Sequence, residues 1–194
     1  MFEKICQWLR EHHVRILPEE LEIFATHTQQ VVIPPQTIIM QQGKPVKKLF
    51  FLNEGIVRLF RMHNDMDFTL GIVSSNDFVS TTTYLLNQHP STCALETLTE
   101  VNALEWNRED VIALLAKTQM ATDIEKAHTD RLLNWMQDIQ IDIMCLTAEE
   151  RYLKLLESQP EVIRTIPLKY IASFLSIHQD SLSRIRNKVG RKEG

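Results

Sequence analysis

A chain of 194 residues with 44% hydrophobic and 24% charged residues has the composition of an ordinary globular protein, with room for one large domain or for a medium and a small one. No apolar run approaches the roughly 20 residues of a membrane span, and the first residues lack the layout of a signal peptide. Three widely spaced cysteines without a CxxC pair disfavour a disulfide framework, a zinc site and an iron–sulfur cluster, so we expect a cytoplasmic protein with buried thiols.

The net charge of −4 is unevenly distributed along the chain. Residues 162–194 hold seven basic and two acidic residues, whereas the first 161 residues hold 14 basic and 23 acidic ones. Because phosphates attract Lys and Arg, a basic end on an acidic body indicates a surface for a polyanion. A merely solvated tail explains the charge alone equally well.

Residues 1–27 are predicted to be helical, since Ile5, Trp8 and Leu9 recur at helical spacing and Pro18 stands near the first turn of a second helix. From Gln30 the pattern changes to short β-branched runs between turn signals, which predicts a small β-roll or barrel. The predicted strands are 31–33, 37–40, 49–52, 56–62, 68–73 and 102–105.

After Asp110 the spacing becomes helical again and predicts a helix of about 25 residues within 117–146. An apolar face this broad exceeds what one domain covers, so we expect it to pack on a second subunit; packing across the β-roll is the alternative. The residues of this face are Leu132, Leu133, Trp135, Met136, Ile139, Ile143 and Leu146.

Residues 147–194 are predicted to form a second domain. Thr147 and Glu150 have the spacing of a capping box that begins a helix. Further on, a helix over 168–175, a tight link at 176–178 and a helix over 179–189 are predicted. Ala172 is small enough for two helices to cross closely, and Ile177 supplies an apolar plug in the turn. This pattern is typical of a helix-turn-helix, whose second helix enters the DNA major groove.

The face of the second helix opposite Leu182, Ile185 and Val189 carries side chains suited to DNA. Arg184 is placed to form a bidentate contact with guanine. Basic residues at the flanks are suited to phosphates, which position a protein without specifying sequence. An αα-hairpin with a solvated polar face is the alternative. The predicted DNA contacts are Lys169, Gln179, Asp180, Ser183, Arg184, Asn187 and Lys188, with Arg186 and Arg191 at the flank.

Three stretches, 150–156, 166–172 and 181–185, resemble the DNA-binding domain of the Crp/Fnr family of bacterial regulators, in the short form common in Bacteroidetes. Gln42-Gly43, Leu49–Arg58 and Asn76-Asp77-Phe78 resemble that family's cyclic-nucleotide-binding β-roll. The resemblance implies an α+β fold in which a jelly-roll-like β-roll with N-terminal helices (1–116), a long dimerisation helix (117–146) and a small helix-turn-helix domain (147–194) follow one another. It also implies a homodimer on double-stranded DNA, with RNA polymerase as a candidate further partner.

The sequence departs from the family pattern in the expected effector pocket. Ser80-Thr81 stands where nucleotide-binding members carry Gly-Glu, and Pro90-Ser91 stands where they carry Arg followed by Ser or Thr. Trp135 and Met136 fall on the adenine side. A buried phosphate without its Arg loses a charge-assisted bidentate contact, so cyclic AMP is not expected to bind. The predicted effector-pocket residues are Ser80, Thr81, Ser91, Trp135 and Met136.

Further departures are Ser176 in place of the usual turn Gly, His178 in place of a Ser or Thr cap, and an end at Gly194 that leaves no room for a two-stranded wing. No enzyme, cofactor or metal site is expected. The sequence lacks a nucleophile motif and a Gly-rich phosphate loop, and His63 and His89 are too far apart for a cupin-like site. The remaining alternative is a regulator that binds a non-nucleotide small molecule or acts through protein partners.

Overall fold

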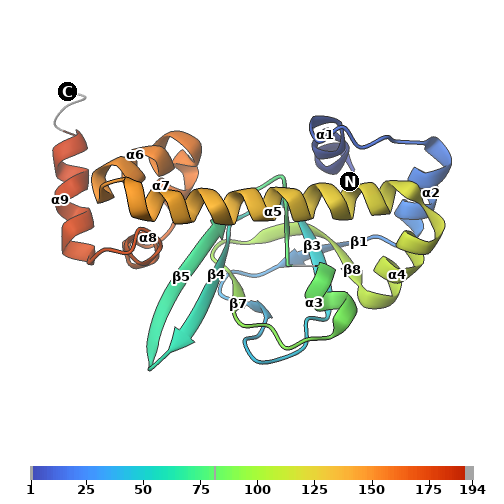
Figure 1. Cartoon of the computed structure of the whole chain (residues 1–194), viewed down its shortest axis with the longest axis horizontal. Helices are drawn as coiled ribbons and strands as arrows, with labels where there is room; N and C mark the ends of the chain where they lie inside the picture. The colour runs from blue at the N-terminus through green and yellow to red at the C-terminus, as the bar shows by residue number, and fades with distance from the viewer. Residues whose placement is uncertain (1, 81, 191–194) are drawn as a thin grey trace.

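The computed structural model describes residues 2–80 and 82–190 and shows three parts along one long helix. α5 (Gln119–Cys145) runs across the whole molecule, with the β-roll against its middle (Figure 1). α1 (Glu3–Glu11), α2 (Pro18–Thr26) and α4 (Arg108–Lys117) gather at one end of α5, and the C-terminal helices gather at the other (Figure 1). Within the described ranges, no helix is long and apolar enough to cross a membrane.

The β-roll consists of two antiparallel sheets with the strand orders β1-β8-β3-β6 and β2-β7-β4-β5 in the described part of the chain. The sequence predicts most of these strands to within a few residues but misses β6 and β7, which are too short to show an alternating pattern. The helix α3 (Thr82–Asn87), which follows β6, is also missed. The strands are β1 (Gln29–Ile33), β2 (Ile38–Met40), β3 (Lys48–Glu54), β4 (Val57–His63), β5 (Met66–Val73), β6 (Asp77–Val79), β7 (Ala94–Thr97) and β8 (Val101–Asn107).

A cluster of aromatic side chains joins the N-terminal helices to the roll. The rings of Trp8, Phe51 and Trp106 surround Phe78, with the Trp8 and Phe51 rings edge-on to it at 5.0 Å between centroids. Edge-to-face pairs add to the stabilisation from burial. Met120 and Ile124 of α5 belong to the same core, so the first half of the long helix is fixed on the roll.

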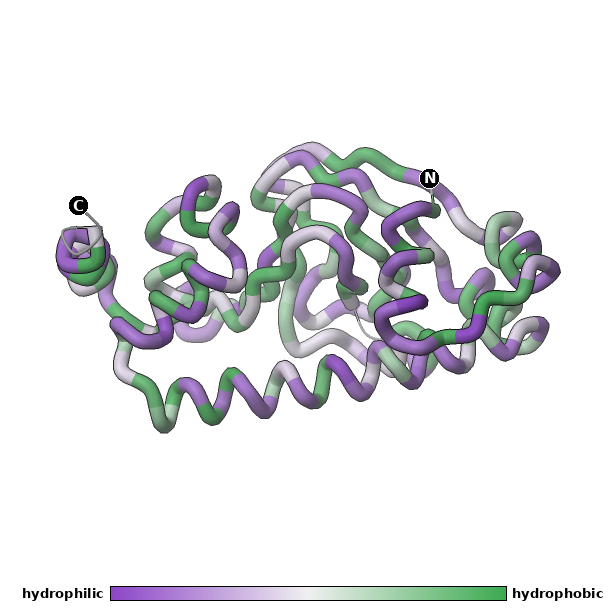
Figure 2. Tube along the Cα trace, turned by 90° about the horizontal axis from the view of Figure 1, so that it is seen from above, coloured by the Kyte–Doolittle hydropathy of each residue, from purple (hydrophilic) through white to green (hydrophobic). Residues whose placement is uncertain are grey.

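The second half of α5 carries apolar side chains that a single chain leaves in solvent. At 100° per residue, Trp135 and Ile139 share an arc that faces the body of the chain, and Leu133, Met136, Ile143 and Met144 occupy the neighbouring arc. Leu133 and Met144 are 60% and 77% exposed. Apolar residues interrupt the polar ones along this helix in Figure 2. A monomer therefore leaves an unusually apolar helix face uncovered.

The C-terminal module begins at the predicted capping box. Thr147 accepts from the Glu150 amide, and the Glu150 carboxylate accepts from the Thr147 amide at 2.8 Å. The helices that follow are α6 (Ala148–Ser158), α7 (Pro160–Thr165), α8 (Leu168–Phe174) and α9 (Gln179–Gly190). Their core continues into the β-roll, because Ile56 and Ile72 are buried in the same cluster as Tyr152 and Leu182.

Candidate functional site

The turn between α8 and α9 has the hydrogen bonding of a Schellman motif. The Ile177 amide donates to the Ala172 carbonyl and the Ser176 amide donates to the Ser173 carbonyl, both at 3.0 Å. Ser176 has φ +55°, the left-handed conformation that this motif requires and that favours Gly. Ser176 therefore occupies the Gly position of the turn, as the sequence predicts, and Ile177 packs against the module's core.

α9 buries one face and exposes the other. Leu182 and Val189 are buried, and Ile185 is partly buried in the same core. α9 stands at one end of the molecule (Figures 1 and 2). The residues predicted to contact bases are all exposed on this helix: Gln179, Asp180, Ser183, Arg184 and Asn187. The Ser183 hydroxyl also donates to the Gln179 carbonyl at 3.1 Å.

Two of the predicted phosphate contacts, Lys188 and Lys169, have partners in the protein. Lys188 is exposed and forms an ion pair with Glu149 of α6. Lys169 is exposed, with its ammonium 4.6 Å from the centre of the Tyr170 ring. Exposed ion pairs of this kind contribute about 0–1 kcal/mol, so a DNA phosphate can displace Glu149 from Lys188 at small cost. Arg186 is exposed on α9, and Arg191 lies outside the described residues.

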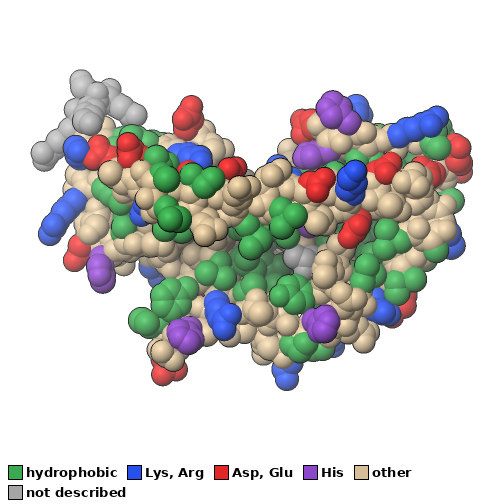
Figure 3. All heavy atoms as spheres, in the orientation of Figure 1, with side chains coloured by type: hydrophobic (Ala, Val, Ile, Leu, Met, Phe, Trp, Pro, Cys, Tyr) green, Lys and Arg blue, Asp and Glu red, His purple; other side chains and the backbone are tan. Residues whose placement is uncertain are grey.

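A groove of about 1480 Å³ lies between α5 and the β-roll. Hydrophobic side chains gather around the hollow below α5 in Figure 3. Among the predicted pocket residues, Ser80, Ser91, Trp135 and Met136 all line this groove, and Thr81 lies outside the described residues. The structure therefore brings together four of the five residues that the resemblance selects.

The two serines of the groove differ in their hydrogen bonding. Ser91 is 2% exposed, and its hydroxyl donates to the Cys93 carbonyl at 2.8 Å while accepting from the Cys93 amide at 3.3 Å. Ser80 has φ +84°, in the left-handed region that favours Gly. Its hydroxyl oxygen is buried without a hydrogen-bond partner among the described residues.

Trp135 and Met136 differ in their surroundings. Trp135 is half-buried and lies so close to Gly71 of β5 that a Cβ added there would be 2.5 Å from the ring carbon Cη2. Met136 is 56% exposed. Trp135 therefore occupies space against the β-roll, whereas Met136 borders solvent and leaves most of the groove open.

Charge at the rim of the groove is mostly negative. Among the described lining residues, five carboxylates outnumber two strong cations, Lys126 and Arg131. Arg131 is held by Asp77 through Nε at 3.0 and 3.1 Å and through a terminal nitrogen. Sequence reasoning missed this ion pair, although Asp77 stands in one of the family-like segments. An acidic rim whose arginine is already paired disfavours a phosphate ligand.

Comparisons with known proteins agree on the fold. The family model for the cyclic nucleotide-binding domain matches residues 30–118. No curated protein sequence matches the chain. The chain is similar in structure to FixK2 from Bradyrhizobium japonicum, with a TM-score of 0.73 and 15% identity over 86% of each chain.

Two further solved structures are similar over most of their length. One is CLP, a c-di-GMP-responsive global regulator of Xanthomonas campestris, with a TM-score of 0.69 and 19% identity over 90% of this chain and 92% of that one. The other, from Eubacterium rectale, is assigned to the Crp/Fnr family of transcriptional regulators, with a TM-score of 0.68 and 11% identity over 91% and 85%. Residues 30–118 therefore match the cyclic nucleotide-binding domain, and the chain has the fold of Crp/Fnr family transcription regulators.

Proposed function

We propose that this protein is a sequence-specific DNA-binding transcription regulator that acts in the cytoplasm as a homodimer. The observation that carries the proposal is the two-sided character of α9. Its apolar face is buried on α8 and α6, and its exposed face presents Arg184, Asn187 and Asp180 at the end of the molecule. Side chains of these types read base edges in the major groove.

The apolar face of α5 supports the proposed dimer. Leu133, Met136, Ile143 and Met144 are exposed apolar residues on one arc of α5, and a second copy of the same helix covers such an arc by symmetry. Two recognition helices then reach half-sites about 10 base pairs apart. Contact with RNA polymerase remains a prediction from the resemblance.

We propose further that cyclic AMP is not the effector. The groove offers a polar, mostly acidic rim, a Ser91 hydroxyl that is bonded to its own turn, and an Arg131 that is bonded to Asp77. Pro90 stands where the phosphate-binding Arg would be. These features favour an uncharged small molecule in the groove, or a protein that binds DNA without an effector.

Substitution of two residues of α9 tests the function. Arg184→Ala is expected to cost about 1–3 kcal/mol in specific binding and to relax preference at one base pair per half-site. Lys188→Ala is expected to weaken specific and non-specific binding alike and to lower the salt slope by about one. Both variants are expected to stay folded, because neither side chain faces Leu182. Fluorescence anisotropy with an operator and a scrambled duplex measures both, and an unchanged ratio of specific to non-specific affinity in Arg184→Ala would contradict the assignment.

A further inference from the structure

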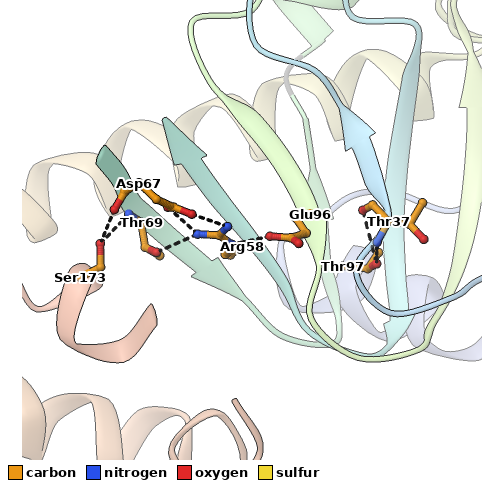
Figure 4. Close-up of polar contacts among 7 residues, drawn as sticks. All are labelled: Thr37, Arg58, Asp67, Thr69, Glu96, Thr97 and Ser173. Atoms are coloured by element: carbon orange, nitrogen blue, oxygen red, sulfur yellow. Dashed lines mark hydrogen bonds and ion pairs between the residues drawn. The ribbon is translucent and has the colours of Figure 1, made fainter. Parts of the chain in front are cut away.

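Arg58 of β4 is a charged side chain in the interior of the molecule, only 3% exposed. Its Nε donates to Glu96 at 2.7 Å, and its two terminal nitrogens donate to the carboxylate of Asp67 at 2.6 and 2.7 Å (Figure 4). Burial lowers the pKa of Arg58, but the hydrogen bonds and charges of Asp67 and Glu96 outweigh it and raise the pKa. Arg58 is therefore a fully paired buried cation.

Two aromatic rings enclose this guanidinium. Its central carbon lies 4.1 Å from the centre of the Phe60 ring and 4.0 Å from the centre of the Tyr170 ring. Phe60 belongs to the same strand, but Tyr170 belongs to α8, the first helix of the helix-turn-helix. A guanidinium stacked on an aromatic face is attracted by it, most strongly where water is excluded. The contact therefore joins the β-roll to the DNA-binding module.

The edge of β5 supports the same junction. β5 is the outer strand of its sheet, so its outward amides have no neighbouring strand. The Thr69 amide donates to the Ser173 hydroxyl at 2.8 Å, and that hydroxyl donates to the Asp67 carbonyl at 3.4 Å (Figure 4). α8 thus closes the edge of β5 with side-chain hydrogen bonds.

The hairpin of β4 and β5 is a single layer between α8 and α5. Arg58 pairs with Ile72 across the hairpin, and the next pair is Leu59 with Gly71. Because neighbouring residues of a strand point to opposite faces, Arg58 faces α8 while Gly71 faces the other way, where Trp135 of α5 packs on it. The position of α8 is thereby tied to α5 through one layer of sheet.

We infer that Arg58 is a positioning residue for DNA recognition: with Tyr170 it fixes α8 on the β4–β5 hairpin and so holds α9 at one orientation relative to the dimer helix α5. The inference rests on the proposed function. Two recognition helices bind both half-sites at once only when their separation is fixed, since the gain from the second contact depends on geometry. Loss of the Arg58–Tyr170 contact should therefore affect two-site binding and spare one-site binding.

The test uses the full-length chain, an operator selected by the wild type, and duplexes in which the half-site spacing is changed by about 1–5 base pairs. Wild type and the control Arg61→Met, which removes an exposed Arg from the same strand, should show a sharp optimum of affinity. Tyr170→Leu should lose about tenfold at the natural spacing, flatten the spacing profile and keep the affinity for a single half-site within about twofold. Tyr170→Phe, which keeps the ring over Arg58, should behave as wild type.

Arg58→Met should have the effect of Tyr170→Leu. Should it fail to fold because Asp67 and Glu96 lose their cation, Tyr170→Leu decides alone, since it leaves both ion pairs intact. A spacing profile in Tyr170→Leu as sharp as that of wild type would overturn the inference. So would an equal loss of affinity for full and single sites, because that result indicates damage to the helix-turn-helix itself.

Hydrogen exchange without DNA separates this inference from the proposed function. Amides of residues 66–70 should exchange about tenfold faster in Tyr170→Leu than in wild type, while those of β8 should not change. Unchanged exchange in 66–70 would overturn the docking of α8 by Arg58 and Tyr170, whatever the DNA experiments show. A wild type without specific affinity for any DNA would contradict the proposed function, and the exchange result would still decide whether the hairpin holds α8.

Discussion

His128 is a buried residue of α5 that lines the groove. It is 6% exposed, and its Nε2 donates to the Ser80 carbonyl at 3.1 Å, since a carbonyl oxygen only accepts. Its Nδ1 is buried without a partner among the described residues. Burial lowers the pKa of His128, more than the Ser80 carbonyl and Asp77 raise it. The folded protein therefore favours the neutral ring.

This lowered pKa predicts a loss of stability in mild acid. Below the ordinary His pKa of 6.5 the unfolded chain binds a proton at His128 that the folded chain resists, so the free energy of unfolding falls with decreasing pH. The contribution of one such proton is at most about 1.4 kcal/mol per pH unit. Urea unfolding between pH 7.5 and about pH 5.5 measures it. His128→Gln should reduce the slope, and the exposed control His63→Gln should not; equal slopes in His128→Gln and wild type would contradict the assignment.

Residues whose role depends on local chain geometry could be predicted from the sequence, and residues whose role depends on distant partners could not. Ser176 and Thr147 have partners within five residues, so the turn and the capping box follow from spacing alone. Arg58 is nine residues from Asp67 and 38 from Glu96 along the chain. The neighbouring hydrogen bond between Thr69 and Ser173 joins residues that are 104 apart. Its burial depends on the tertiary fold, which no periodicity encodes.

α5 is the element on which the oligomeric state depends. Its residues 133, 136, 143 and 144 lie within about 100° of each other on a regular helix, beside the arc that faces the body. Leu133→Asp should therefore give a folded monomer, because it puts a charge into the proposed interface and leaves the chain's own core intact. Sedimentation at micromolar concentration should give about 45 kDa for the wild type, twice the 22.6 kDa chain mass.

The neighbouring substitution Asn134→Asp is the control for this experiment. Asn134 is exposed and lies 100° away from Leu133 on the helix, so the same charge there should leave the dimer intact. A wild-type monomer, or a Leu133→Asp variant that stays dimeric, would contradict the role proposed for α5.

Long elements could be predicted well and short ones poorly. The sequence predicts α5 within 117–146 and the structure places it at Gln119–Cys145, because several turns of periodic side chains determine it. β6, β7, α3 and α7 escape prediction, since few of the elements with three to six residues show a period; β2, which is as short, is predicted. β6, β7 and α3 border the groove, so the sequence says least about the shape of the groove.

At the scale of the whole molecule, the β-roll matches the cyclic nucleotide-binding domain, but the rim of its groove is mostly acidic. Neither cyclic AMP nor cyclic GMP is expected to bind, because the resemblance puts Pro90 where a phosphate-binding Arg is expected and because Arg131 is paired with Asp77. Without a bidentate, charge-assisted contact to the phosphate, the affinity of the groove for either nucleotide is lower. Titration calorimetry with millimolar nucleotide should show no saturable heat; saturable heat from either would contradict the effector proposal.

The central claim is that this protein reads DNA sequence as a two-fold dimer, and selection from genomic fragments at several salt concentrations tests it most directly. We expect that a small set of sequences is enriched and that each contains two inverted half-sites about 10 base pairs apart. The affinity for these sequences should exceed that for random DNA by at least about a thousandfold, while both affinities fall with salt. Binding that falls with salt but enriches no sequence would contradict the claim and would leave the basic C-terminal module as an electrostatic anchor.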